Sequence, residues 1–277
     1  MWLLDTMTIE LKSFFGDKIP EYAILSHTWA DDEVLFEDVY QKPVEQWKDK
    51  AGGVKVLKFA ELAAQREMKY AWVDTCCIDK RSSAELSEAI NSMFEWYAKS
   101  RICYAYLSDR SKVQPKGEEA PPPDTVPFEE SRWFKRGWTE LIAPRKVQFL
   151  NREWSNIGSR SRWSETISFI TGIDKSALKS SWGLPWYYHQ SVHTKMAWAQ
   201  GRETTREEDR AYSLMGLFGV NMPLLYGEGF LAFERLFDEI IKNTRIGIQM
   251  LTRRSPDLKW VVDLRHFGSR QPDRAWK

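Results

Sequence analysis

The sequence predicts an α/β fold with a mostly parallel sheet and helices on its faces. Two apolar runs rich in aromatic and β-branched residues, Tyr70–Cys77 and Ile102–Leu107, are expected to be buried strands. Between them, apolar residues at helical spacing predict an amphipathic helix over Leu86–Ala98, opened by a capping box of Ser82 and Glu85. Strand, helix and strand in this order form a βαβ unit, which makes the two strands parallel.

The same alternation continues toward the N-terminus and indicates a Rossmann-like or flavodoxin-like sheet. A strand is expected at Tyr22–Ser26 and a helix at Lys55–Glu67, with Gly52-Gly53 as the break before it. Trp2–Leu4 and Val147–Leu150 are further short strand candidates.

The C-terminal half is expected to be mainly helical. A capping box of Thr204 and Glu207 predicts the start of a helix over Arg206–Phe218, which Gly219 would end. The other helices are expected at Trp163–Ile170, Ser191–Ala199 and Phe230–Lys242.

These elements divide the chain into a sheet core and a helical part. The predicted parts are an α/β core over residues 1–150 with a Pro-rich insert at 111–130, a helical part over 151–242, and a poorly ordered tail over 243–277.

Composition narrows the function classes. The 277 residues carry 40 basic and 39 acidic side chains, so the near-neutral charge gives no footprint for nucleic acid or an anionic membrane. The three cysteines lie in or beside expected buried strands, and no signal peptide or membrane span is apparent. We therefore expect a cytoplasmic protein with reduced thiols.

Common catalytic motifs are missing from the sequence. The pair Cys76-Cys77 lacks metal-ligand spacing, and the four histidines are scattered, so no metal site is expected. No phosphate-binding lysine loop, no G-x-G-x-x-G and no G-x-S-x-G is present either.

Candidate site residues follow from the predicted sheet, because ligands bind beyond the carboxyl ends of parallel strands. There the sequence places a polar and aromatic loop beginning at His27 and Trp29, and the run from Asp74 to Asp79. The plainer alternative is a surface turn in which Trp29 packs and His27 bonds to backbone. Glu140, close in sequence to two tryptophans, could be partly desolvated and suited to acid–base work, although most such residues are simply solvated.

Four segments are similar to the blocks of the fungal heterokaryon-incompatibility (HET) domain, and the similarity extends from residue 1 to about residue 242. The segments are YAILSHTW (22–29), WVDTCCID (72–79), SRWFKRGWTELIAP (131–144) and TTREEDRAYSLMGLFGVNMPLLYGEG (204–229).

This resemblance implies a role in programmed cell death after fusion of unlike fungal cells. HET domains are held to be remote relatives of TIR domains, an innate-immunity fold, and many TIR domains cleave NAD at the nicotinamide–ribose bond. By resemblance Glu140 becomes the catalytic candidate, with NAD as substrate and no prosthetic group. The residues implied to line the site are Ser26, His27, Trp29, Asp74, Asp79 and Trp138. Activity would depend on homo-oligomers.

One block departs from the family pattern. The chain reads Trp138-Thr139-Glu140, two residues shorter than the family's W-T-L-Q-E. Residues four apart on a helix nearly share a face, whereas residues two apart point about 200° apart. The alternatives are therefore a non-enzymatic module that self-associates or binds partner signalling proteins, or a decayed member of the family.

Overall fold

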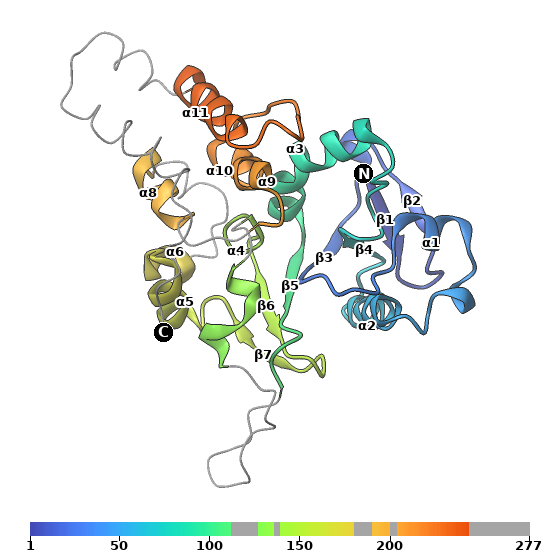
Figure 1. Ribbon diagram of the computed structural model, residues 1–277. Coiled ribbons are helices and arrows are strands. Elements are labelled where there is room, and N and C mark those ends of the chain that lie inside the picture. Colours follow the sequence, from blue (N-terminus) through green and yellow to red (C-terminus); the bar gives the residue numbers. More distant parts are fainter. Residues whose placement is uncertain (112–126, 136–138, 180–189, 200–203, 244–277) are drawn as a thin grey trace, which may run out of the picture.

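The computed structural model describes residues 1–111, 127–135, 139–179, 190–199 and 204–243. Seven strands form one sheet in the order β2-β1-β4-β3-β5-β6-β7. They are β1 (Trp2–Asp5), β2 (Leu11–Ser13), β3 (Tyr22–His27), β4 (Tyr70–Val73), β5 (Ile102–Tyr106), β6 (Val147–Leu150) and β7 (Asn156–Ser159). The four central strands are parallel, and the pairs β2–β1, β1–β4 and β6–β7 toward the edges are antiparallel (Figure 1). The expected α/β class is confirmed, in the form of a mixed sheet.

Side-chain alternation along the strands separates the two faces. Ile24 pairs with both Trp72 and Cys103, so these three residues share one face. On this face Trp72 packs edge-on against Tyr97 of α3 (Ser83–Lys99), with ring centroids 5.9 Å apart. The other face belongs to α2 (Ala51–Gln65), whose Phe59 contacts the ring of Tyr104.

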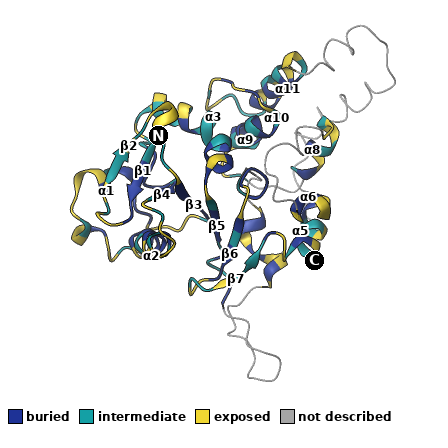
Figure 2. Cartoon of the chain, turned by 180° about the vertical axis from the view of Figure 1, so that it is seen from behind, coloured by how far each residue is buried: buried dark blue, intermediate teal, exposed yellow. Residues whose placement is uncertain are grey.

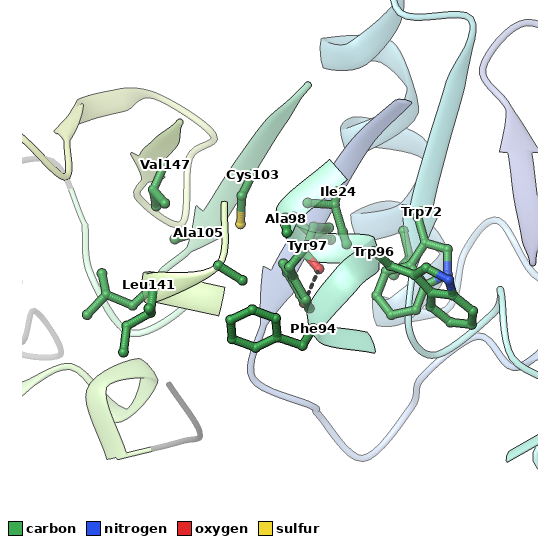
Figure 3. Packing of buried hydrophobic residues seen from close by; sticks show 14 of the residues in the cluster. Ile24, Trp72, Phe94, Trp96, Tyr97, Ala98, Cys103, Ala105, Leu141 and Val147 are labelled. Atoms are coloured by element: carbon green, nitrogen blue, oxygen red, sulfur yellow. Dashed lines mark hydrogen bonds between the residues drawn. The ribbon is translucent and has the colours of Figure 1, made fainter. Parts of the chain in front are cut away.

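The strands make the center of the core. All six residues of β3 are buried, as a strand flanked by helices on both faces requires (Figure 2). On the α3 face the apolar layer continues from Trp72 past Tyr97 to Leu141 (Figure 3). Leu141 belongs to the short helix α4 (Thr139–Ile142), so α3 and α4 cover the same face.

The remaining helices lie mostly after the sheet, as expected. They are α1 (Phe36–Gln41), α5 (Ser164–Thr171), α6 (Lys175–Lys179), α8 (Val192–Trp198), α9 (Glu207–Tyr212), α10 (Met215–Phe218) and α11 (Leu231–Asn243). Short 3₁₀ turns occur at Gly16–Lys18, Val44–Gln46, Phe128–Glu130 and Arg132–Lys135. Asn243, the first residue of the predicted tail over 243–277, is the last residue of α11. The rest of that tail and most of the predicted insert lie outside the described residues.

The helical part meets the sheet core through α3. Gly216 of α10 lies so close to α3 that a Cβ there would come within 2.1 Å of the Phe94 Cβ. Beside it, the Asn91 amide exchanges two hydrogen bonds with the backbone of Met222, at 3.2 and 3.3 Å. Only glycine permits this approach of the two helices.

Three sequence predictions were wrong in detail. The strand at Tyr70 ends at Val73, because the Cys77 amide turns back to the Val73 carbonyl. Gly52-Gly53 lies inside α2 rather than before it, since a Cβ on Gly53 would meet the Trp47 carbonyl oxygen at 2.1 Å and glycine allows the close packing.

The third wrong prediction is the single helix over Arg206–Phe218. The structure forms two helices there, α9 and α10. Thr204 does not cap the first of them, because its hydroxyl donates to the Arg206 carbonyl. Gly219 does end the second in a left-handed conformation, with φ of 65°.

Of the two hydrogen bonds expected in the capping box of Ser82 and Glu85, the structure contains one. Ser82 accepts the Glu85 amide at 3.2 Å, but the Glu85 carboxylate accepts from the Asp79 amide instead of the Ser82 amide. The turn before α3 is thereby tied to the first turn of the helix.

Candidate functional site at the carboxyl ends of the parallel strands

The carboxyl ends of β3 and β4 bring three predicted site residues together. His27 is the last residue of β3, and Asp74 follows the last residue of β4. Since a carboxylate only accepts, the His27 Nε2 donates to Asp74 Oδ1 at 2.9 Å, and the indole of Trp29 donates to Asp74 Oδ2 at 2.9 Å. One carboxylate therefore fixes both rings.

A second, buried carboxylate supports the same loop from the α2 side. Glu33 accepts the Ala30 amide at 2.7 Å, forms an ion pair with Lys55 of α2, and lies 4.0 Å from the Nδ1 of His27. Its other oxygen, Oε2, is buried with no hydrogen-bond partner among the described residues. His27, with 1% of its side chain exposed, is thus enclosed between two carboxylates.

Trp29 is the accessible member of this group. Its side chain is 45% exposed, although its N–H is fixed by Asp74. The ammonium of Lys80 lies 3.7 Å from the centroid of the ring, a cation–π contact that covers part of one face. An indole that is fixed at its edge and partly exposed can stack a flat ligand.

Asp79 and Ser26 are less available to a ligand. Asp79 binds Arg81 through two side-chain bonds of 2.8 Å, and this hydrogen bonding lowers the pKa of the Asp79 carboxyl. The Ser26 hydroxyl accepts the indole N–H of Trp133 at 2.8 Å, and both side chains are buried. Both residues lie near the carboxyl ends, but their polar groups already hold structural bonds.

Glu140 lies elsewhere. Its carbonyl oxygen accepts from the thiol of Cys103 at 3.8 Å, at the amino end of β5. Cys103 precedes Tyr106, the residue paired with His27, by three positions, which is roughly 10 Å along a strand. Cys103 also faces α3, whereas His27 faces α2. The structure therefore does not bring Glu140 together with Trp29 and Asp74 within one chain, and Trp138 lies outside the described residues.

A buried arginine holds the Glu140 helix in place. Arg160, at the end of β7, donates to the carbonyls of Leu141 at 2.7 Å and Pro144 at 2.9 Å. It also reaches the carbonyls of Arg145 and Leu178, both at 3.3 Å. Burial lowers the pKa of Arg160 to about 10, so it stays charged at neutral pH.

Comparison with known proteins places this arrangement in a family. The family model for the heterokaryon incompatibility protein (HET) matches residues 22–124. Over 237 residues, 84% of the chain, the sequence is 47% identical to the vegetative incompatibility protein HET-E-1 of Podospora anserina. The chain carries a HET domain. It spans 17% of the length of HET-E-1, and no solved structure matches it.

The segment that the family model matches includes some of the predicted site residues and leaves out others. Residues 22–124 contain the whole group around Trp29, from β3 through Asp79, but not Glu140. Three residues that complete that group, Glu33, Lys55 and Lys80, were not singled out as site residues from the sequence, although Glu33 belongs to the predicted loop after His27. Glu33 lies six residues after His27 in the sequence. Its proximity to the imidazole arises only because the loop folds back onto α2, and this is seen only in the structure.

Metal-binding clusters and membrane-spanning helices are both absent from the part of the chain that the structure describes. Within the residues that the structure describes, no group of three His, Cys, Asp or Glu side chains could hold a metal ion. Across the same residues, no helix has the length and apolar character needed to span a bilayer.

Proposed function

We propose that this HET domain signals in heterokaryon incompatibility in the cytoplasm, and that its chemistry is cleavage of NAD at the nicotinamide–ribose bond. The relative HET-E-1 is named as a vegetative incompatibility protein, which supports the first part. The observation that carries the second is the fixed and half-exposed Trp29 indole at the carboxyl ends of parallel strands, where open α/β sheets bind nucleotides. The proposal includes the remote TIR-like kinship of the fold.

Glu140 is the proposed catalytic carboxylate. It would hold the ribose hydroxyls and stabilise the oxocarbenium-like transition state as nicotinamide leaves, as carboxylates do beside glycosidic bonds. No metal or prosthetic group is needed, because the pyridinium ring leaves as neutral nicotinamide. Water then attacks the ribose carbon and loses a proton, which gives ADP-ribose and nicotinamide.

The distance between Glu140 and Trp29 within one chain has a consequence for assembly. Since Glu140 lies beside the amino end of β5 and Trp29 lies beyond the carboxyl end of β3, we propose that a homo-oligomer supplies Trp29 from one copy and Glu140 from another. A site shared between copies would make activity depend on protein concentration.

The test follows nicotinamide release by chromatography for the wild type, Glu140→Gln and Trp29→Ala, with Glu61→Gln as control. Glu61 is an exposed carboxylate on α2 and should leave turnover unchanged. Glu140→Gln and Trp29→Ala should each be inactive alone. In a mixture, heterodimers with one intact site should restore about a quarter of wild-type activity. No restoration, with wild type active, would contradict the shared site.

The second candidate is a non-enzymatic module that self-associates or binds partner signalling proteins. It is favoured by one observation: the polar groups of Ser26 and Asp79 are already bonded within the chain, and the backbone of Glu140 lies beside Cys103, away from the carboxyl ends of the strands. It predicts that Glu140→Gln still kills cells after fusion. Turnover that appears only after Leu-Gln is inserted between Thr139 and Glu140 would instead identify an inactivated enzyme.

A further inference from the structure

The outer side of the last described helices combines apolar and acidic side chains. On α11, Leu231, Glu234 and Asp238 are spaced three and four residues apart, so they share one side of the helix, and all three are exposed (Figure 2). In the preceding loop, Leu225 and Tyr226 are 51% and 37% exposed. The α9–α11 face is defined here by six exposed residues: Glu207, Leu225, Tyr226, Leu231, Glu234 and Asp238.

We propose that residues 244–277, the segment that follows α11, dock on the α9–α11 face of the same chain. The face lies in the helical part of the domain and contains none of the proposed site residues. The inference is therefore independent of the proposed NAD chemistry.

The charges of the segment and the face are complementary. Residues 244–277 carry eight basic and three acidic side chains, a net charge of +5. Residues 204–243 carry four basic and seven acidic side chains, a net charge of −3, whereas residues 1–203 have a net charge of only −1. The excess negative charge is thus concentrated directly before the segment that carries the positive charge, and opposite potentials favour association of the two.

The acids of the face are available for such pairing. Three of them have no ion-pair partner among the described residues: Glu207, Glu234 and Asp238. Of the four basic side chains in residues 204–243, three already contact an aromatic ring or a carboxylate, namely Arg206, Arg235 and Lys242. The fourth, Arg210, is half-buried.

The apolar part of the face is held in place by groups beneath it. Glu208 accepts two glycine amides of the loop, at 2.7 and 3.1 Å, and Asp209 accepts the hydroxyl of Tyr226 at 3.0 Å. The Leu225 amide donates to the Tyr212 hydroxyl at 2.8 Å. Since this loop is already fixed with its apolar side chains in solvent, a segment that covers them pays little entropy for ordering the loop.

The segment is long enough to reach the face. It starts where α11 ends, and the 13 residues of α11 span about 20 Å. Its 34 residues, at up to about 3.3 Å each, can return along the whole helix, and they include the large apolar side chains of Trp260 and Trp276. Because the segment is tethered to α11, its effective concentration at the face is of millimolar order.

Tryptic cleavage of the full chain tests the proposal, because the segment contains Arg253 and Arg254. The face variant neutralises three acids without adding a cleavage site: Glu207→Gln, Glu234→Gln and Asp238→Asn. The matched control makes the same change at three exposed acids elsewhere: Glu45→Gln, Asp49→Asn and Glu88→Gln. At low salt we expect cleavage after Arg253 and Arg254 to be at least about threefold faster in the face variant than in the wild type and the control.

Salt provides a second condition for the same assay. In 1 M salt the Debye length is about 3 Å, so the three proteins should be cleaved at similar rates. Equal rates in the face variant and the control at low salt would overturn the proposal.

A nitroxide label locates the contact without removing any residue of the face. It is placed on Pro223→Cys, beside the exposed loop, or on Glu61→Cys of α2 as the control, and the three native cysteines are buried. In the full chain labelled with 5-fluorotryptophan, the ¹⁹F resonances of Trp260 and Trp276 are those lost in the corresponding Phe variants. The label at 223 should broaden them, and the label at 61 should not.

Dilution distinguishes the tethered segment from that of a second copy. Broadening by the label at 223 should stay unchanged on tenfold dilution, because docking within one chain does not depend on protein concentration. Loss of broadening on dilution would assign the contact to another copy and overturn the proposal. Broadening by neither label, or equal broadening by both, would overturn it as well.

Discussion

The loop around Trp29 and the helix around Glu140 are held in place in different ways. In the loop, side chains bind side chains: Asp74 fixes His27 and Trp29, and Glu33 fixes Lys55. In the helix, one side chain, Arg160, binds backbone carbonyls on both sides of Pro144.

The difference teaches how each region responds to sequence change. Backbone carbonyls are present whatever the residue, so the Arg160 anchorage depends on the path of the backbone and not on the side chains of α4. The Trp29 loop depends on the identity of several side chains, and a single substitution there disturbs its neighbours. The two regions can therefore be separated experimentally.

The largest effect is expected from Arg160→Met. Three buried hydrogen bonds, to the carbonyls of Leu141, Pro144 and Leu178, and one partly buried bond to the carbonyl of Arg145 are lost. We expect the free energy of unfolding to fall by about 3–5 kcal/mol, measured by urea titration. The exposed neighbour Arg162→Met is the control and should change it by less than about 0.5 kcal/mol. Equal effects would show that Arg160 is not the anchor of α4.

A smaller loss is expected from Asp74→Ala. The His27 Nε2 and the Trp29 indole N–H lose their acceptor. The loss at His27 should cost more free energy, because its imidazole is buried and no water can replace the carboxylate. The free energy of unfolding should fall by about 2–3 kcal/mol, and the fluorescence of Trp29 should shift as the ring is released. Asp31→Ala, an exposed acid in the same loop, should leave both readings unchanged. A stable protein with an unchanged Trp29 signal would refute the side-chain anchorage.

Each region also contains a buried thiol that makes stability depend on alkaline pH. Burial and the nearby Glu140 raise the pKa of Cys103, while a hydrogen bond with Cys77, burial and Asp74 raise the pKa of Cys76. Below the pKa of an unfolded thiol, about 8.5, both states keep the proton and stability is complete. Above it the unfolded chain loses the proton first, so stability falls by up to about 1.4 kcal/mol per pH unit for each thiol.

Cys103→Ala and Cys76→Ala should each reduce that alkaline slope, measured by urea titration between pH 8 and 10. A slope that is the same in wild type and both variants would show that these thiols do not titrate in this way.

The smallest effect is expected at the surface pair of Asp79 and Arg81. Hydrogen bonding to Arg81 lowers the pKa of Asp79, so the pair stabilises the fold above the unfolded pKa of about 3.9 and stops doing so as pH falls through the lower, folded pKa. Because Arg81 is 52% exposed, Arg81→Ala should leave the midpoint of urea unfolding at pH 7 almost unchanged. A clear fall of that midpoint would indicate that the pair organises the turn before α3.

The central strands were predictable because their residues are buried on both faces. Apolar runs such as Tyr22–Ser26 have no other stable location, and the βαβ order then sets their direction. Strand β7, read as Asn-Ile-Gly-Ser, was missed because an edge strand with an exposed side carries no such run. Gly52 and Gly53 were misplaced, since tight packing against Trp47 and Val34 overrides the low helix propensity of glycine.

The candidate site was predictable in part. The polar residues after β3 and β4 meet because parallel strands end at the same edge, which explains His27, Trp29 and Asp74. Glu140 was grouped with them only through a motif. The sequence itself argues against that grouping. Strand β6 begins at Val147, seven residues after Glu140, and so short a connection keeps α4 close to the amino end of that strand. Lys55 and Arg160 could not be foreseen, because their partners are distant in sequence.

The order of the strands in the sequence also sets how long the sheet stays incomplete during translation. The central strand β3 ends at His27, but the fourth parallel strand, β6, starts 120 residues later at Val147. At roughly 5–20 residues per second, a ribosome needs about 6–24 s to supply those residues. Throughout that interval the apolar strand is synthesised but its sheet is incomplete. Slower translation of this stretch should therefore increase the demand for chaperones that cover exposed strands.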